Sequence, residues 1–171
     1  WSIVGVSIFG TTLILLYMSS TLYHAFSNGR VKQIFKTLDQ SFIYLLIAGT
    51  YTPVLLITLR NTLGWTVFVL VWVMAIGGIT HRIFFSDKLK TLSVVSYITM
   101  GWLSLIVLKS LLNAAPVELV VWLLIGGAFY TGGLIFYSWE RLPFNHAIWH
   151  LFVMGGSICH FFAIYYGVLP V

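Results

Sequence analysis

His146 and His150 are spaced so that both imidazoles could bind one metal ion. They bracket the stretch His146-Ala147-Ile148-Trp149-His150 near the end of the chain. In a helix, residues four apart stack on one face with about 6 Å between them. Neutral imidazole is a favoured ligand of Zn²⁺, and three histidines with a fourth position open to water form a catalytic type of zinc site. The pair therefore predicts half of a metal site, whose third ligand must come from elsewhere.

Three residues in the first part of the chain could complete such a site. His24 is a third candidate ligand, Ser20 precedes it by one helical turn, and Asp39 follows it. Asp39 could serve as general base for a water at the metal, and Ser20 could orient a second water or donate to a developing oxyanion. Each has a structural alternative. Asp39 could simply be a negative charge that complements the positive N-terminus of a helix. Ser20 could hydrogen bond to a carbonyl of its own helix. The histidines could lie among lipid headgroups.

The composition identifies an integral membrane protein. Hydrophobic residues make up 60% of the chain and charged residues 8%, with a mean hydropathy of +0.99, whereas soluble domains are about 25% charged. The single cysteine, Cys159, excludes an intrachain disulfide and a cysteine-rich metal site. The nine Lys and Arg residues are scattered and form no long basic run, which argues against a nucleic-acid partner and for the charge bias of membrane loops. The expected partners are the lipid bilayer and a lipid substrate.

Six apolar stretches are each long enough to cross a hydrocarbon core of about 30 Å as a helix. They predict an all-α, polytopic transmembrane bundle, with Pro53 as a kink in the second span. Glycine pairs in the third and fifth spans predict close contacts between helices. The predicted spans are residues 1–25, 38–59, 63–81, 91–112, 118–139 and 145–167.

The positive charges predict the orientation of these spans and bring the candidate ligands to one end. The first, third and fifth connections carry seven of the nine basic residues, namely Arg30, Lys32, Lys36, Arg82, Lys88, Lys90 and Arg141, whereas the opposite side carries Arg60 and Lys109. Basic loops stay in the cytoplasm. His24, Asp39, His146 and His150 then share one depth near the cytoplasmic face of the plasma (inner) membrane. Ionisable groups within a membrane are functional candidates, so the sequence predicts that these residues meet.

Two other histidines are expected outside the metal site. His160 lies ten residues beyond His150, about 15 Å further along the helix, so it cannot bind the same ion. We expect a structural hydrogen bond for His160 and a headgroup or loop contact for His81. The chain begins at Trp1 rather than at a methionine, with no charge in residues 1–29. We therefore expect a longer protein with one more helix upstream, making seven, and a single transmembrane domain over residues 1–171.

Three motifs together resemble the bacterial hemolysin III proteins, which are relatives of the progestin and adiponectin receptors. The motifs are Ser20-Thr21-Leu22-Tyr23-His24, Asp39-Gln40 and the run from Pro143 to Phe152. The resemblance implies a seven-helix fold whose first helix has no counterpart here. It also implies zinc bound at the positions of His24, His146 and His150, with Asp39 nearby and Ser20 as the motif serine. Kinship of the wider superfamily with alkaline ceramidases implies hydrolysis of lipid amides.

Three functions are compatible with the sequence. The first is a zinc-dependent hydrolase acting on a lipid amide or ester, which requires an open coordination position and Asp39. The second is a receptor-like or regulatory membrane protein, in which zinc is structural and the coordination is closed. The third is a membrane-perturbing hemolysin, whose effect on a bilayer would be independent of the histidines.

Overall fold

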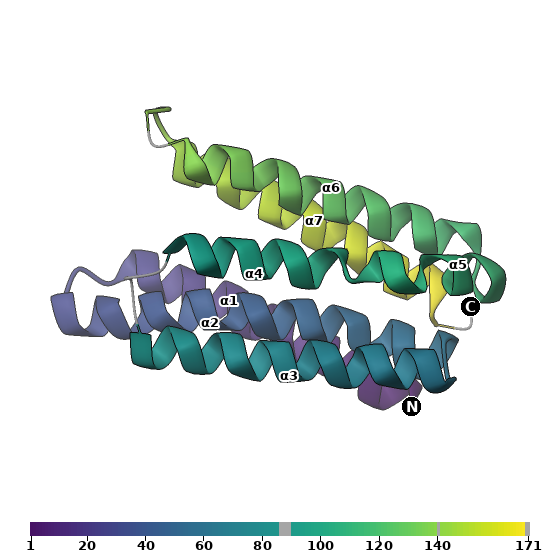
Figure 1. Ribbon diagram of the computed structural model, residues 1–171. Coiled ribbons are helices and arrows are strands. Elements are labelled where there is room, and N and C mark those ends of the chain that lie inside the picture. Colours follow the sequence, from purple (N-terminus) through teal and green to yellow (C-terminus); the bar gives the residue numbers. More distant parts are fainter. Residues whose placement is uncertain (86–89, 140, 170–171) are drawn as a thin grey trace. The chain divides into compact units, whose positions relative to one another are not determined.

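The computed structural model describes residues 1–85, 90–139 and 141–169. The described residues form helices and no strand, and six helical spans are long and apolar enough to cross a membrane. This confirms the predicted all-α transmembrane architecture. The helices are α1 (Ser2–Ala25), α2 (Gly29–Pro53), the π-helix η1 (Val54–Thr58), α3 (Thr62–Phe85), α4 (Lys90–Trp102), α5 (Ser104–Ala114), α6 (Val117–Ser138) and α7 (Asn145–Gly167) (Figure 1).

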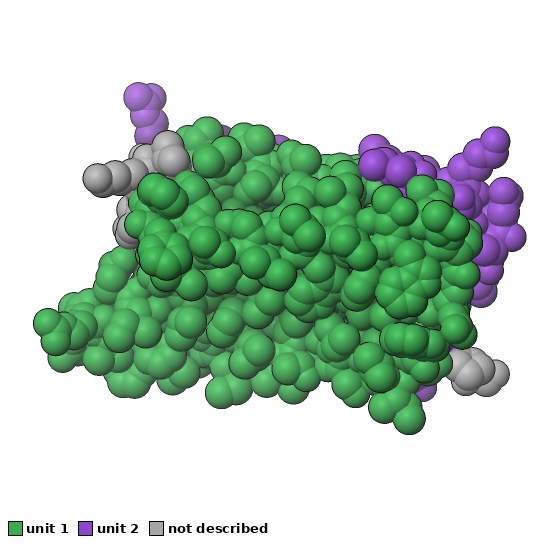
Figure 2. Space-filling view, turned by 60° about the horizontal axis from the view of Figure 1, so that its bottom comes forward, with its two compact units in different colours: residues 1–103 green, residues 104–171 purple. Residues whose placement is uncertain are grey.

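The chain divides into two compact units, Trp1–Leu103 and Ser104–Val171 (Figure 2). In the first unit α2 packs against α1, α3 and α4, and in the second α6 packs along α7. Within the most apolar part of each span, 67% of the α2–η1 span is buried, whereas only 17–28% of each other span is buried. Helix α2 is therefore the central helix of its unit, and the remaining helices keep broad apolar faces for lipid.

Tyr44 marks the point where α2, α3 and α4 meet in the first unit. Its side chain is 1% exposed, and its hydroxyl lies 2.7 Å from Ser96 Oγ of α4. The ring lies against Gly78 of α3, where a Cβ would collide with it. Gly78 thus bears out the close contact predicted for the glycine pair in the third span.

The start of α2 differs from the prediction. Asn28 caps the helix, because its Oδ1 accepts the backbone N–H groups of Arg30 and Val31 at 3.1 and 3.4 Å. Consequently Arg30, Lys32 and Lys36, which were predicted to fill a loop, lie in the first turns of α2. The prediction was wrong because the apolar run measures the part of a helix inside the hydrocarbon, whereas the cap determines where the helix begins.

The connection after α3 is also shorter than predicted. Helix α3 continues to Phe85, so Arg82 lies in its last turn and is 4% exposed instead of belonging to a loop. Lys90 begins α4. The other two charges predicted for this loop, Asp87 and Lys88, lie outside the described residues.

Two spans contain a backbone irregularity. The α-helical hydrogen bonding of the second span changes at Pro53 to the wider π-helix η1, which locates the predicted distortion. The fourth span was predicted as one continuous helix, but it is broken between α4 and α5 at Leu103. The Tyr51 hydroxyl lies 2.9 and 2.8 Å from the carbonyl oxygens of Met100 and Gly101, and the two oxygens share its single proton. Carbonyls at a break in a membrane helix need such donors, so a residue of another span stabilises the break.

Small residues allow α6 and α7 to approach closely in the second unit. Gly126 faces the ring of His160, and a Cβ at Gly133 would lie 2.8 Å from Phe152 Cβ. The Tyr130 hydroxyl of α6 lies 2.8 Å from Ser157 Oγ of α7. Of the glycine pairs predicted for the fifth span, the pair at 126–127 therefore contributes Gly126 to this interface, and the pair at 132–133 contributes both residues.

Candidate metal centre

The two histidines at the start of α7 direct the same ring nitrogen at one point. His146 Nε2 and His150 Nε2 lie 3.0 Å apart, and the two rings are nearly perpendicular at 89°. Two ligands of a tetrahedral Zn²⁺ with bonds of about 2.0–2.1 Å are about 3.3–3.4 Å apart. The pair therefore needs only a small adjustment to hold one ion, as its spacing in the sequence predicted.

The backbone before α7 places His146 in the first turn of the helix. Phe144 adopts a left-handed conformation with φ of 60°, which is uncommon for a non-glycine residue. Asn145 Oδ1 then accepts the backbone N–H of His146 at 2.7 Å. The ring of Tyr137, at the end of α6, lies 5.2 Å from the Trp149 ring and 6.4 Å from the His146 ring. The histidine spacing gave no indication of these supporting residues, and only the Pro143-Phe144-Asn145 motif marked this turn.

Ser20 and Asp39 meet in the first unit, where α1 packs against α2. The Ser20 side chain lies at the Asp39 carboxyl group, close enough to act on it as a hydrogen-bond donor. Its neighbours Ser19 and Thr21 instead donate to carbonyls of their own helix, at 2.8 and 2.7 Å. Ser20 thus makes the contact between helices that a site near His24 requires, although the sequence left bonding within its own helix as an alternative.

His24 lies in the last turn of α1, one helical turn after Ser20. Its ring centroid is 4.7 Å from that of Tyr23, and the Lys32 ammonium lies 5.5 Å from the Tyr23 ring centroid. His24 therefore belongs to an aromatic and basic group at the end of α1 where the chain turns into α2.

His160 and His81 have surroundings different from those of the histidine pair. His160 Nε2 lies 3.3 Å from the Leu123 carbonyl oxygen, and its ring meets the edge of the Tyr130 ring, which confirms the predicted structural hydrogen bond. His81 stacks on Phe85 with ring centroids 5.4 Å apart. Its Nε2 is buried with no hydrogen-bond partner in the described part of the chain, so the predicted contact with a headgroup or loop does not account for it.

Comparison with known proteins identifies the family. The model of the family described as haemolysin-III related matches residues 1–161. The chain belongs to this family. The "Hemolysin-3" of Bacillus cereus is 49% identical over 169 residues, which are 99% of this chain and 77% of that protein. The "Hemolysin-3 homolog" of Bacillus subtilis is 48% identical, over 96% of this chain and 77% of its own length.

A human relative extends the comparison. The "Monocyte to macrophage differentiation factor" of Homo sapiens is 31% identical to this haemolysin III-related chain, over 96% of the chain and 71% of that protein. These matches confirm the family resemblance predicted from the three motifs. Together with the six apolar helices of the described chain, family membership indicates a multi-pass membrane protein.

The donor set of this haemolysin III-related chain fits a metal ion such as zinc. All three of its candidate ligands, His24, His146 and His150, are histidines, and neutral imidazoles are ligands for Zn²⁺ and other divalent metals. His24 belongs to the first unit, and the other two belong to the second. Each unit thus offers part of the predicted set: the first supplies His24 with the Ser20–Asp39 pair, and the second supplies two imidazole nitrogens from one helix.

Proposed function

We propose that this chain is a metal-dependent hydrolase that acts on a lipid amide or ester. In this proposal His24, His146 and His150 bind Zn²⁺ together, and Asp39 and Ser20 carry the proton chemistry. The observation that carries the proposal is the 3.0 Å separation of His146 Nε2 and His150 Nε2, because two ring nitrogens at this distance suit one shared ion. Without an ion the same two nitrogens hydrogen bond to each other at this distance, so the metal content of the protein distinguishes the two states.

The contact between Ser20 and Asp39 supports a catalytic role for the carboxylate. When bound, Zn²⁺ supplies Lewis-acid chemistry, which polarises a carbonyl group and lowers the pKa of water. The Asp39 carboxylate accepts a proton from the attacking water as general base. Ser20 donates to the same carboxylate and fixes its orientation. Because this contact fixes the Asp39 carboxylate, its second oxygen points in one direction. A freely rotating side chain would have no such preferred direction.

The membrane topology supports a lipid as substrate. The uneven distribution of basic residues favours an orientation in which the ends of α1 and α6 and the start of α7 face the cytoplasm. In this orientation the site lies at the cytoplasmic side of the plasma membrane, at the depth of lipid headgroups and their amide or ester links. A substrate in the inner leaflet could reach it without leaving the bilayer.

Metal content tests the first half of the proposal. The detergent-purified protein is analysed by mass spectrometry for metals, beside the His146→Ala/His150→Ala double variant and a His160→Gln control. We expect about one zinc ion per chain in the parent and the control, and none in the double variant. His160→Gln is matched because it removes an imidazole from the same helix while keeping a donor for the Leu123 carbonyl. A parent protein without metal would refute both zinc functions.

Hydrolysis tests the second half. The metal-loaded protein is incubated with lipid amides and lipid esters in mixed micelles, and Asp39→Asn is the catalytic control. Removal of a general base typically lowers the rate by about 10²–10⁴, so we expect a loss of this size with the zinc retained. Full turnover by Asp39→Asn would exclude the carboxylate as base. Bound zinc without hydrolysis, together with a lower melting temperature after chelation, would instead favour the receptor-like protein with structural zinc.

Membrane perturbation is the second candidate function, and the names of the Bacillus relatives favour it. One relative is called "Hemolysin-3" and another "Hemolysin-3 homolog". Release of a fluorescent dye from phospholipid vesicles measures this activity directly. Release by the parent and by the His146→Ala/His150→Ala variant to the same extent would support this function over the hydrolase, whereas intact vesicles would exclude it.

A further inference from the structure

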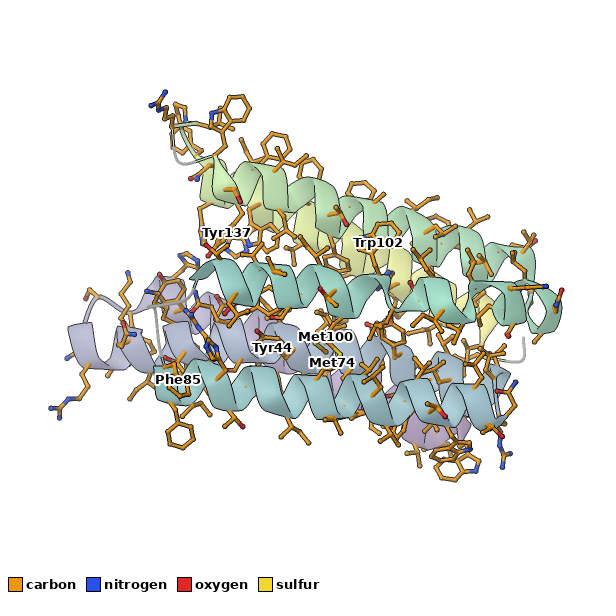
Figure 3. The ribbon with its side chains drawn as sticks, in the orientation of Figure 1. Tyr44, Met74, Phe85, Met100, Trp102 and Tyr137 are labelled. Atoms are coloured by element: carbon orange, nitrogen blue, oxygen red, sulfur yellow. The ribbon has the colours of Figure 1, made fainter. Side chains whose placement is uncertain are left out.

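A second polar region lies inside the first unit, next to Tyr44. Tyr44 of α2 contacts Gly78 of α3 and hydrogen bonds to Ser96 of α4, so these three helices meet at one level (Figure 3). The ring of Tyr97 lies 4.5 Å from that of Tyr44, and its hydroxyl donates to the Gln40 carbonyl at 2.8 Å. The level is therefore well defined by contacts on all three helices.

One turn away, each of the three helices contributes a polar side chain. Residues three apart lie on the same face of a helix. Successive helices α2, α3 and α4 run in alternating directions (Figure 1), so the next level is reached by going back along α2, forward along α3 and back along α4. These steps lead from Tyr44 to Ser41, from Gly78 to His81 and from Ser96 to Ser93. We call this group, with Arg82 beside it, the polar layer.

The polar layer contains hydrogen-bonding atoms whose capacity is unused. Ser41 is 3% exposed and Ser93 is 5% exposed. In the described part of the chain, no atom hydrogen bonds to Ser41 Oγ, Ser93 Oγ or His81 Nε2, and all three atoms are buried. Buried polar atoms are nearly always paired with protein, water or a ligand. Three unpaired atoms from three helices at one level therefore indicate something that they bind.

The chemistry of the layer favours an anion. Two hydroxyls and an imidazole nitrogen can all donate, and Arg82, which follows His81 and is 4% exposed, adds a positive charge. Gln40 Oε1 is also buried without a partner, and a rotation of the amide group presents its N–H₂ in place of the oxygen. An acceptor-rich, negatively charged group can accept from all of these residues.

The layer is separate from the proposed metal centre. Ser41 lies two residues after Asp39, which corresponds to about 200° around a helix. Asp39 faces α1, where it meets Ser20, whereas Ser41 and Tyr44 share the opposite side of α2, facing α3 and α4. Arg82 lies in the last turn of a membrane span, the depth at which phospholipid phosphates are found.

We propose that Ser41, His81, Arg82 and Ser93 form a binding site for a phosphate group, supplied either by inorganic phosphate or by a phospholipid headgroup. The site goes beyond the proposed hydrolase and does not depend on it. A tetrahedral phosphate has enough oxygens to accept from donors that converge from three helices. Hydrogen bonds to an ionised acceptor are the stronger class, which suits a site built from two hydroxyls and one imidazole.

Thermal unfolding of the purified full chain in a phosphate-free detergent tests the site. One arm titrates inorganic phosphate against sodium chloride at equal ionic strength. A second adds phosphatidylglycerol, with a phosphate-free glycolipid as its control. We expect a saturable rise in melting temperature in at least one arm, and the responding arm identifies the source. In the Ser41→Ala/Ser93→Ala variant the apparent Kd should rise about tenfold or more for each hydroxyl removed.

A matched control separates binding from a general effect of removing hydroxyls. Thr80→Ala/Thr99→Ala removes exposed hydroxyls from α3 and α4, each bonded only to its own helix in the contacts described, and should keep the full response. Arg82→Gln should weaken the response if the ligand is charged. No shift in either arm, or an equal shift in the Ser41→Ala/Ser93→Ala variant, would overturn the proposal. A variant that is more stable than the parent without any ligand response would identify the hydroxyls as merely unpaired.

Discussion

Replacing Ser20 by alanine tests the contact on which the catalytic proposal for Asp39 depends. Ser20 donates to the Asp39 carboxyl group between α1 and α2. A hydrogen bond to a charged group contributes about 1.5–3 kcal/mol to stability. We therefore expect Ser20→Ala to lower the free energy of unfolding by this amount, which corresponds to about a tenfold change or more in the unfolding equilibrium constant.

The adjacent serine supplies a control of the same chemical type. Ser19 is 3% exposed, and its hydroxyl donates a hydrogen bond to the Leu16 carbonyl of its own helix, with the two oxygens 2.8 Å apart. That carbonyl remains available to the helical hydrogen bonding, so Ser19→Ala should change the free energy of unfolding by at most about 0.5 kcal/mol. The two substitutions remove the same atom from neighbouring positions, where the hydroxyls have different partners and Ser19 is the more buried of the two.

Reversible unfolding in mixed detergent and dodecyl sulfate micelles, followed by tryptophan fluorescence, measures both effects. A double-mutant cycle of Ser20→Ala with Asp39→Ala isolates the pairwise energy. We expect a coupling of about 1.5–3 kcal/mol. Equal effects of Ser19→Ala and Ser20→Ala, or a coupling within about 0.5 kcal/mol of zero, would refute the view that Ser20 holds Asp39.

Three other substitutions test the packing and the backbone. Gly126→Ala places a Cβ against the His160 ring and the Gly156 carbonyl oxygen, so thermal unfolding should show a loss of about 1–3 kcal/mol, and an unchanged stability would contradict this contact. Tyr51→Phe removes the donor to the carbonyls at the α4–α5 break and should cost about 1–3 kcal/mol, with faster amide exchange near Leu103. Phe144→Gly relieves a left-handed conformation at a side chain that is 83% exposed. It should therefore raise stability by up to about 1 kcal/mol in the same unfolding assay, whereas a loss would show that Phe144 is not strained.

The sequence predicted those features that local periodicity determines. The spacing of His146 and His150 fixes their shared face wherever that stretch is helical, and the structure places their Nε2 atoms together. The bounds of α1 and α7 follow the ends of the apolar runs closely. The family resemblance was also predictable, because it depends on three motifs and not on geometry.

Features that depend on distant partners were not predictable. The start of α2 depends on the Asn28 cap, which lies beyond the apolar run. The break at Leu103 is stabilised by the Tyr51 hydroxyl, which donates a hydrogen bond from another span. Counting spans placed His24 and Asp39 at one depth, but which of the serines before His24 faces the carboxylate follows from the packing of α1 against α2. The three-histidine metal set and its zinc remain a proposal.

The start of α7 is a weak point of the fold that a bound cation would strengthen. It follows a left-handed Phe144, which provides no side-chain hydrogen bond to the helix, so the N–H groups of Asn145 and His146 are accepted by the Leu142 carbonyl and by Asn145 Oδ1 instead of by a capping side chain. Both candidate ligands, His146 and His150, lie in the first two turns, so an ion held by them joins two successive turns of one helix. Metal occupancy and helix formation are then thermodynamically linked, because a ligand that binds only the helical state stabilises it in proportion to the logarithm of its concentration. Amide exchange at these turns should accordingly slow as metal is added, which reports the order of a helix terminus as well as the filling of a site.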